Sequence, residues 1–185
     1  MPSGGMKTIK TATNQKRLIH IYTGASKGKT TAAVGLATRA LGAGWKVLFC
    51  SLFKPDGSSE HEPLVKLGAT LIRFSWRGNF FRKYTAEELN EQREDFTVFL
   101  AEVEKRWQNY DLVVMDEVVY ALTGNVCKEA DFLAFLDRKP DTVELVFTGR
   151  DYPKSIIDRA GYVTEMKQIK HPFDDGFLPR KGVEF

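Results

Sequence analysis

Cysteine is scarce in this chain, which has Cys50 and Cys127 alone among its 185 residues. The two form no CxxC pair or Cys/His cluster, so the sequence indicates neither a disulfide-rich secreted scaffold nor a zinc site. Long apolar runs are also missing, because no segment approaches the roughly 20 apolar residues that a membrane-spanning helix needs. The polar, basic start lacks the apolar core of a secretory signal. We therefore expect a cytoplasmic protein without a membrane segment and with two buried thiols.

An excess of one charge is lacking too, since 27 Lys and Arg residues stand against 24 Asp and Glu, a net charge of +3. This near balance favours mild attraction of anions over a broad nucleic-acid surface, so we expect no nucleic-acid partner. Hydrophobic residues make up 43% of the chain, which at this length suits one well-buried core. We expect a flexible basic arm over residues 1–17 and a single domain over residues 18–185.

Short apolar runs alternate along the chain with helical patterns. The expected strands cover residues 18–22, 46–52, 70–74, 112–116, 143–148 and 162–166. Such alternation predicts an α/β fold, a three-layer sandwich around a mostly parallel central sheet of about six strands. In such sheets ligands bind beyond the carboxyl ends of the strands, so functional residues are sought where each strand ends.

One helix has a clear start signal. The hydroxyl of Thr85 can cap it and Glu88 can reach back to the same turn, as in a capping box. The spacing of the apolar residues that follow predicts one buried helix face. That face consists of Leu89, Phe96, Leu100, Val103 and Trp107.

The first expected strand ends in "TGASKGKT", residues Thr23 to Thr30, and an alanine-rich helix follows. This pattern is typical of a phosphate-binding loop, in which backbone N–H groups wrap the phosphates, Lys29 neutralises charge and the Thr30 hydroxyl can ligate Mg²⁺. The usual GxxxxGK[ST] pattern has glycine where Thr23 stands, whereas here the first glycine is Gly24. Strand, loop and helix together favour this interpretation over a chance Gly-Lys-Thr turn, and predict a P-loop NTPase-like fold that binds ATP or a close relative. The expected ATP-binding residues are Gly24, Ala25, Ser26, Lys27, Gly28, Lys29, Thr30 and Thr31.

The fourth expected strand, in "LVVMDEVVY", ends at Asp116 and Glu117. We expect this strand beside the first one, so that a carboxylate can hold Mg²⁺ together with Thr30 and phosphate. Asp116 is the stronger candidate of the two. The alternative is that the acidic pair merely starts a helix.

Two later segments carry further basic residues. In "TGRDYP", after the fifth strand, Arg150 either reaches a polyphosphate or forms a surface pair with Asp151. The tail "VTEMKQIKHPFDDGFLPRKGVEF" contains basic side chains among proline and glycine, which suits an irregular segment. By its chemistry alone this tail is a second anion contact or a dimer surface.

Taken together, four segments resemble one family. "YTGASKGKTTAAVGLATRALGAG", "VVMDEVVYAL", "VELVFTGRDYP" and the tail beginning "VTEMKQIKHPF" look like the successive motifs of the P-loop ATP:corrinoid adenosyltransferases, the CobA/BtuR/CobO-like class of cob(I)alamin adenosyltransferase. The likeness runs from about Leu18 to the last residue. It implies an EC 2.5.1-type transferase that moves the 5′-deoxyadenosyl group of ATP to the cobalt(I) of a reduced corrinoid. Triphosphate is released, and adenosylcobalamin or a related adenosylcorrinoid forms.

The resemblance also implies roles for residues. Lys29, Thr30, Asp116, Glu117 and Arg150 would be catalytic, and Thr30, Asp116 and Glu117 would hold Mg²⁺. Phe74 and Trp76 resemble an FxW pattern that packs beneath the corrin ring in this family and replaces the lower axial ligand of cobalt. Without the resemblance, these aromatic residues would be expected in the core.

The family further implies a homodimer whose basic arm covers the neighbouring site, and a reduced flavoprotein as a transient electron donor. Two residues depart from its pattern. Ser26 stands where family loops often have a second glycine, and a positive φ there would cost about 1 kcal/mol or more. Pro179 stands where alanine is expected.

Two other functions stay open on the residues alone. The first is a P-loop ATPase or kinase that acts at the γ-phosphate and yields inorganic phosphate or ADP. The second is a non-catalytic corrinoid-binding protein that uses nucleotide as a switch. A phosphate-binding loop does not by itself decide between them.

Overall fold

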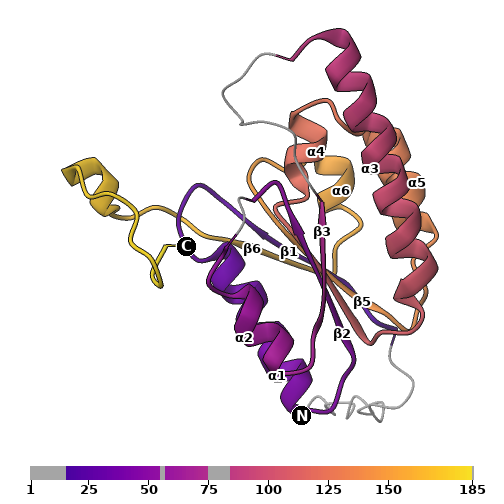
Figure 1. Ribbon diagram of the computed structural model, residues 1–185, viewed down its shortest axis with the longest axis horizontal. Helices are drawn as coiled ribbons and strands as arrows, with labels where there is room; N and C mark the ends of the chain where they lie inside the picture. The colour runs from indigo at the N-terminus through magenta and orange to yellow at the C-terminus, as the bar shows by residue number, and fades with distance from the viewer. Residues whose placement is uncertain (1–15, 55–56, 75–83, 185) are drawn as a thin grey trace, which may run out of the picture.

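The computed structural model describes residues 16–54, 57–74 and 84–184, and six strands form one sheet in the order β3-β2-β4-β5-β1-β6 (Figure 1). All neighbouring strands pair in parallel. The strands are β1 Ile19–Thr23, β2 Val47–Leu52, β3 Thr70–Phe74, β4 Leu112–Asp116, β5 Glu144–Thr148 and β6 Tyr162–Glu165. Each predicted strand is confirmed, with its ends within one residue of the expected ones.

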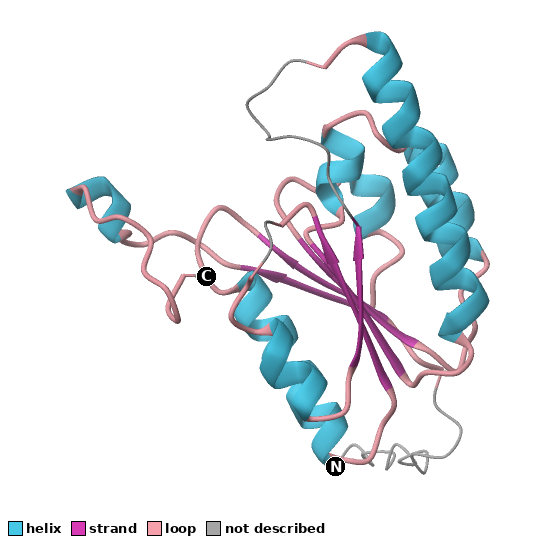
Figure 2. Cartoon of the chain, in the orientation of Figure 1, coloured by secondary structure: helices cyan, strands magenta, loops and turns pink. Residues whose placement is uncertain are grey.

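Helices cover both faces of this sheet (Figure 2). One face carries α1 and α2, and the other carries α3, α4, α5 and α6 (Figure 1). Their bounds are α1 Lys29–Gly42, α2 His61–Lys66, α3 Ala86–Trp107, α4 Val119–Thr123, α5 Glu129–Asp137 and α6 Lys154–Ile157, with a 3₁₀ turn, η2, over Pro172–Asp175. The three-layer α/β sandwich predicted from the sequence is therefore confirmed.

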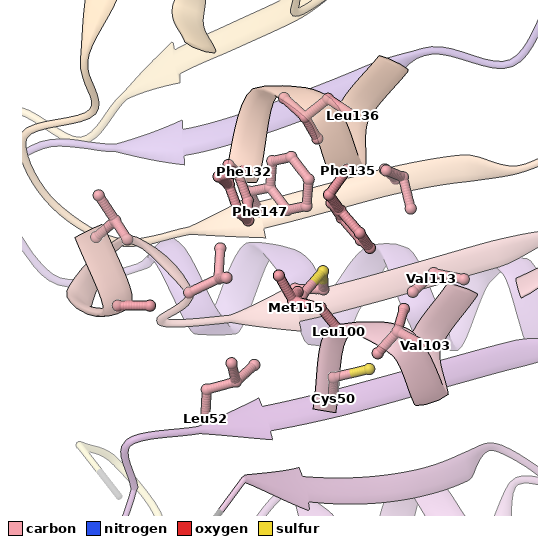
Figure 3. Packing of buried hydrophobic residues seen from close by; sticks show 14 of the residues in the cluster. Cys50, Leu52, Leu100, Val103, Val113, Met115, Phe132, Phe135, Leu136 and Phe147 are labelled. Carbon is pink, nitrogen blue, oxygen red and sulfur yellow. The ribbon is translucent and has the colours of Figure 1, made fainter. Parts of the chain in front are cut away.

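The hydrophobic core lies on both sides of the central strands, because β2 and β4 are buried over their whole lengths. Cys50 and Met115 face the larger cluster under α3 and α5 (Figure 3), and Phe49 and Val114 face the smaller one under α1. Strands buried on both faces are continuous apolar runs in the sequence. Their positions could therefore be predicted well. The underside of α1 is a stripe of small, buried side chains, Ala33, Ala37 and Ala40.

The predicted capping box of α3 is confirmed. Glu88 N donates to Thr85 Oγ1 at 3.2 Å, and Thr85 N donates to Glu88 Oε2 at 2.9 Å. The predicted buried face is confirmed except at Leu89, which is half-buried, while Gln92 is buried instead. The difference arises because the start of α3 projects beyond the sheet (Figure 1).

The expectation that the fourth strand lies beside the first is wrong, because β5 separates β4 from β1. The residues of β5 pair with both neighbours, so that Val146 opposes Val114 on β4 and His20 on β1. Strand β5 is nearly as buried as β4, whereas every residue of β6 is exposed. Burial therefore places β5 inside the sheet and β6 at its edge. The segments after β1, β5 and β4 still meet at one end of the sheet.

The structure also bears on the expectations about membrane helices, the two cysteines and the N-terminal arm. Within the described ranges, no helix is both long and apolar enough to cross a membrane. Cys50 is buried and Cys127 is half-buried, both as free thiols, and burial raises the pKa of each. Of the expected arm, the described residues are Lys16, which pairs with Asp141 at 2.9 Å, and Arg17; the rest lies outside the described residues.

Candidate nucleotide-binding site

The phosphate-binding loop connects β1 to α1 and is fastened to the chain that leaves β6. Met166 N donates to Thr23 O at 2.8 Å, and Ser26 N donates to Met166 O at 3.1 Å. Gly24 has a φ of +103°, and a Cβ atom there would lie 2.6 Å from the Met166 carbonyl oxygen. Only glycine meets both conditions. The displaced glycine of the motif therefore stands where the loop passes against β6.

Ser26 adopts no left-handed conformation. The non-glycine residues with positive φ in the described chain are Phe53, Glu117, Asn125 and Asp151. The backbone strain that serine would have added at this loop position is therefore absent. Its side chain is accommodated in a loop whose left-handed turns are made by Gly24 and Gly28.

Lys29 begins α1 and lies across the loop. Its Nζ donates to Gly24 O and Ser26 O, both at 2.8 Å, and the residue is 7% exposed. Burial lowers the pKa of Lys29, and the nearby Glu117 carboxylate opposes that effect. The first turn of the 14-residue α1 adds its backbone N–H groups and the positive end of the helix dipole. This arrangement suits a bound polyphosphate.

Asp116 is fully buried at the end of β4 and is held by three partners. Thr148 Oγ1 donates to its Oδ1 at 2.6 Å, Thr30 Oγ1 donates to the same oxygen at 2.9 Å, and Lys54 forms an ion pair with Oδ2. The structure therefore brings Thr30 and Asp116 together, although β5 lies between their strands. Helix α1 crosses the sheet to make this contact.

Glu117 lies beside Asp116 in a strained conformation, with a φ of +65°. Its N–H donates to Thr148 Oγ1 at 2.8 Å, and its buried Oε2 has no hydrogen-bond partner among the described residues. Burial and the charge of Asp116 raise the pKa of Glu117 to about 6. A left-handed non-glycine residue costs roughly 1–3 kcal/mol and is typical of functional sites.

These oxygen atoms fit a magnesium ion. Mg²⁺ prefers carboxylate, hydroxyl and phosphate oxygens as ligands. The unpaired Oε2 of Glu117 is a third oxygen that could ligate the ion, beside those of Thr30 and Asp116. No group of three or more His, Cys, Asp or Glu side chains in the described ranges is placed to hold a metal. Phosphate oxygens would thus have to complete the shell.

Lys54, two residues after the end of β2, belongs to the site although no sequence motif indicated it. Besides its pair with Asp116, its Nζ donates to Glu60 Oε1 at 2.9 Å and to Thr30 Oγ1 at 3.2 Å. Burial lowers the pKa of Lys54, but the carboxylates of Asp116 and Glu60 outweigh burial and raise it above its ordinary value. A basic residue at the end of an apolar strand was the available signal, but it belongs to no phosphate-binding motif.

Arg150 is exposed and faces the loop. It lines a cavity of 260 Å³ together with Lys29, Thr30 and Glu117. Among the described residues it makes no ion pair with Asp151. A second cavity, of 410 Å³, is lined by Thr30, Lys54 and Glu117 among others. The C-terminal tail lines both cavities through Val183 and Glu184.

The tail contacts the loop through Lys27. Its Nζ donates to Val183 O at 2.5 Å and pairs with Glu184 Oε1 at 3.2 Å. Within the tail, Arg180 NH2 pairs with the same Glu184 oxygen at 3.0 Å. The tail is thus placed beside the loop, as expected for a second anion contact, but its partners here are carboxylate and carbonyl groups.

Of the two aromatic residues of the FxW pattern, the structure describes Phe74. Phe74 ends β3, is 6% exposed and packs edge-on against Phe53, Phe96 and Phe99 at ring distances of 5.3–5.5 Å. Trp76 lies outside the described residues. The corrinoid role of the pair stays a prediction.

Comparison with known proteins adds evidence along the whole chain. The family "ATP:corrinoid adenosyltransferase BtuR/CobO/CobP" matches residues 15–185. Proteins named corrinoid adenosyltransferase from Sinorhizobium sp and Pseudomonas aeruginosa are each 30% identical to it, covering 97% and 96% of this chain and 85% and 88% of theirs. The Escherichia coli K12 protein of that name is 29% identical, over 96% of this chain and 90% of its own. The crystal structure of the RadB recombinase has a TM-score of 0.53 at 14% identity, covering 85% of this chain and 78% of that one, which shows likeness of fold alone.

Proposed function

The chain belongs to the ATP:corrinoid adenosyltransferase family and transfers an adenosyl group from ATP to a corrinoid, and from this premise we propose that the acceptor is cobalt(I) and that triphosphate leaves as one unit. The observation that carries the proposal is the family match over residues 15–185. The phosphate-binding loop, with Thr30 and Asp116 in contact, supports it.

The proposed step is a displacement at the C5′ carbon of ATP. The electron pair of substrate cobalt(I) forms the Co–C5′ bond, and the C5′–O bond breaks with its electron pair passing to the triphosphate. Cobalt(I) is already a strong nucleophile, so the protein needs no general base. Its task is to present C5′ to cobalt and to stabilise the charge that gathers on the leaving group.

Charge on the leaving triphosphate would be offset by Lys29 and by Arg150, which line the same cavity. Thr30, Asp116 and Glu117 would hold Mg²⁺. When bound, Mg²⁺ supplies Lewis-acid stabilisation of phosphate oxygens. The loop amides and the start of α1 fix the phosphates, so the nucleoside end is left to face the corrinoid.

On the corrinoid side, we propose that Phe74 and Trp76 lie beneath the corrin ring and displace the lower axial ligand. Phe74 itself is anchored in an aromatic cluster with Phe96 and Phe99. Trp76→Ala should then spare the reaction with prereduced cobalt(I) but impair the use of cobalt(II). Both assays are run with the same variant, and equal losses in the two would remove this role for the tryptophan.

We further propose that residues 18–185 form the catalytic domain and that residues 1–17 form a basic arm. In a homodimer, this arm covers the site of the second subunit. A reduced flavoprotein would supply the electron. The two free thiols suit a cytoplasmic location. The proposed adenosyl transfer would make the enzyme a transferase of the EC 2.5.1 type.

One anaerobic assay tests the proposed reaction. Protein, MgATP and chemically reduced cobalamin are mixed, the loss of the cobalt(I) spectrum is followed, and the phosphate product is identified. Adenosylcobalamin with triphosphate is expected. Orthophosphate or ADP without an adenosylated corrinoid would favour an ATPase or kinase, and tight binding without spectral change would favour a non-catalytic corrinoid-binding protein.

A further inference from the structure

Lys54 lies within the candidate nucleotide site, where it lines a cavity with Thr30 and Glu117. Its ammonium contacts Asp116 and donates to Thr30 Oγ1 at 3.2 Å, and these are two of the groups proposed to hold Mg²⁺. Its third partner is Glu60, whose Oε1 lies 2.9 Å away. The Lys54 side chain is 17% exposed, and that of Asp116 is 0% exposed. A cation of the protein thus lies among oxygens suited to a metal cation.

We propose that Lys54 is a built-in counter-cation, which neutralises Asp116 until a divalent cation displaces it from Thr30 and Asp116. The inference rests on the proposed function in taking these two residues as metal ligands. The displaced ammonium stays beside Glu60 in the 410 Å³ cavity that Thr30, Thr31 and Glu117 also line. There it faces the triphosphate.

Electrostatics give this exchange a physical reason. A buried carboxylate without a counter-charge is costly, so Asp116 needs a cation whether or not a metal is bound. A bound magnesium ion takes over that task, while the triphosphate brings more negative charge than the ion removes. A lysine released by the metal can then neutralise the phosphates without leaving the site.

The backbone before Lys54 is built to hold it in place. Phe53 has a φ of +53°, a left-handed conformation that a bulky aromatic residue adopts only when its surroundings enforce it. Its side chain is 5% exposed and packs against Phe74 and Phe96 at ring distances of 5.3 and 6.3 Å. The core therefore fixes the bend from which Lys54 extends.

Metal binding without nucleotide tests the inference. Mn²⁺ is titrated into the full-length protein, and free Mn²⁺ is measured by electron paramagnetic resonance. Lys54→Met should bind Mn²⁺ at least about tenfold more tightly than the wild type, because no ammonium competes for Asp116. Lys54→Arg, which keeps the charge, should bind as weakly as the wild type. Equal or weaker Mn²⁺ binding by Lys54→Met would overturn the proposal.

Two controls keep the result clear. Lys66→Met removes an exposed lysine that pairs with Glu62 on α2, and should leave Mn²⁺ affinity unchanged. Lys54→Gln can still donate to Glu60 but carries no charge, so it should repeat the tighter binding even where the methionine variant folds poorly. In both uncharged variants Mn²⁺ should raise the melting temperature more than in the wild type, and no such gain would count against the proposal. Because no corrinoid is present, these outcomes are independent of whether adenosyl transfer occurs.

Discussion

The carboxyl end of β4 and the C-terminal tail after β6 both lie beside the phosphate-binding loop, but they differ in almost every physical respect. Asp116 is fully buried and has three polar partners. In the tail, by contrast, Ile169 is 84% and Leu178 is 79% exposed. In the first region, the polar partners of Asp116 all come from the same chain. The second presents apolar surface of the kind that proteins cover with a partner or a ligand.

This contrast separates two tasks within the site. Holding phosphates requires charges and donors at fixed positions, which the packed end of the sheet supplies. The exposed tail contacts the loop mainly through the partly exposed Lys27 and Glu184, and such ion pairs contribute little stability. Changes near β4 should therefore have large effects, and changes in the tail should have small effects on folding.

The largest effect is expected from Lys29→Ala. The variant loses the buried ammonium that spans the loop, so turnover of cobalt(I) corrinoid with MgATP should fall by at least about 10²–10³-fold. The anaerobic cobalt(I) assay measures this loss. By comparison, Lys27→Ala removes a more exposed loop charge that contacts the tail, so its loss of turnover should stay below about tenfold. Similar losses in both variants would erase the distinction between the two regions.

Gly24→Ala should be next. Its Cβ atom would meet the Met166 carbonyl oxygen at 2.6 Å in a left-handed conformation, so we expect a loss of about 2–3 kcal/mol in the free energy of unfolding. Urea denaturation measures it. The matched control is Gly44→Ala, where φ is +81° but no atom lies within 4 Å, and about 1 kcal/mol is expected. Equal costs would show that the contact with β6 is unimportant.

Glu117 should give a pH-dependent effect of intermediate size. Its pKa is raised from 4.5 to about 6, so the folded state binds this proton more tightly than the unfolded state. The destabilising contribution is absent below about pH 4.5, grows as the pH rises and is complete above about pH 6, reaching up to about 2 kcal/mol. Urea denaturation across this range should show a steeper decline for the wild type than for Glu117→Gln. If the free energy of unfolding changed with pH in the same way in the wild type and in Glu117→Gln, the raised pKa of Glu117 would be contradicted.

The smallest effect on stability is expected from removing the tail after Met166. The free energy of unfolding should change by less than about 1 kcal/mol, because the exposed side chains of Ile169, Phe173 and Leu178 bury little surface. Chemical denaturation of the truncated chain measures the change. A loss of several kcal/mol would mean that the tail is part of the core.

The sequence predicted the buried strands well because parallel strands are apolar on both faces. It also predicted that Thr30 and Asp116 lie at one site, because both stand at or beyond the carboxyl end of a strand. It failed on strand order, since nothing local in β4 or β5 states which one neighbours β1. Lys54 escaped notice because its role depends on the left-handed turn at Phe53 and on Glu60, neither of which forms a recognisable spacing. The prediction that Leu89 is buried was wrong because the spacing of apolar residues does not show where a helix extends beyond the sheet.

The alanine stripe on the underside of α1 has a consequence for magnesium chemistry. Strands β1 and β4 are two inter-strand steps apart, roughly 10 Å, yet Thr30 reaches Asp116 across that gap. Because Ala33 and Ala37 present only methyl groups, α1 can pack closely against the sheet. The spacing of a polar pair is thus set by the thickness of an apolar layer up to two turns away.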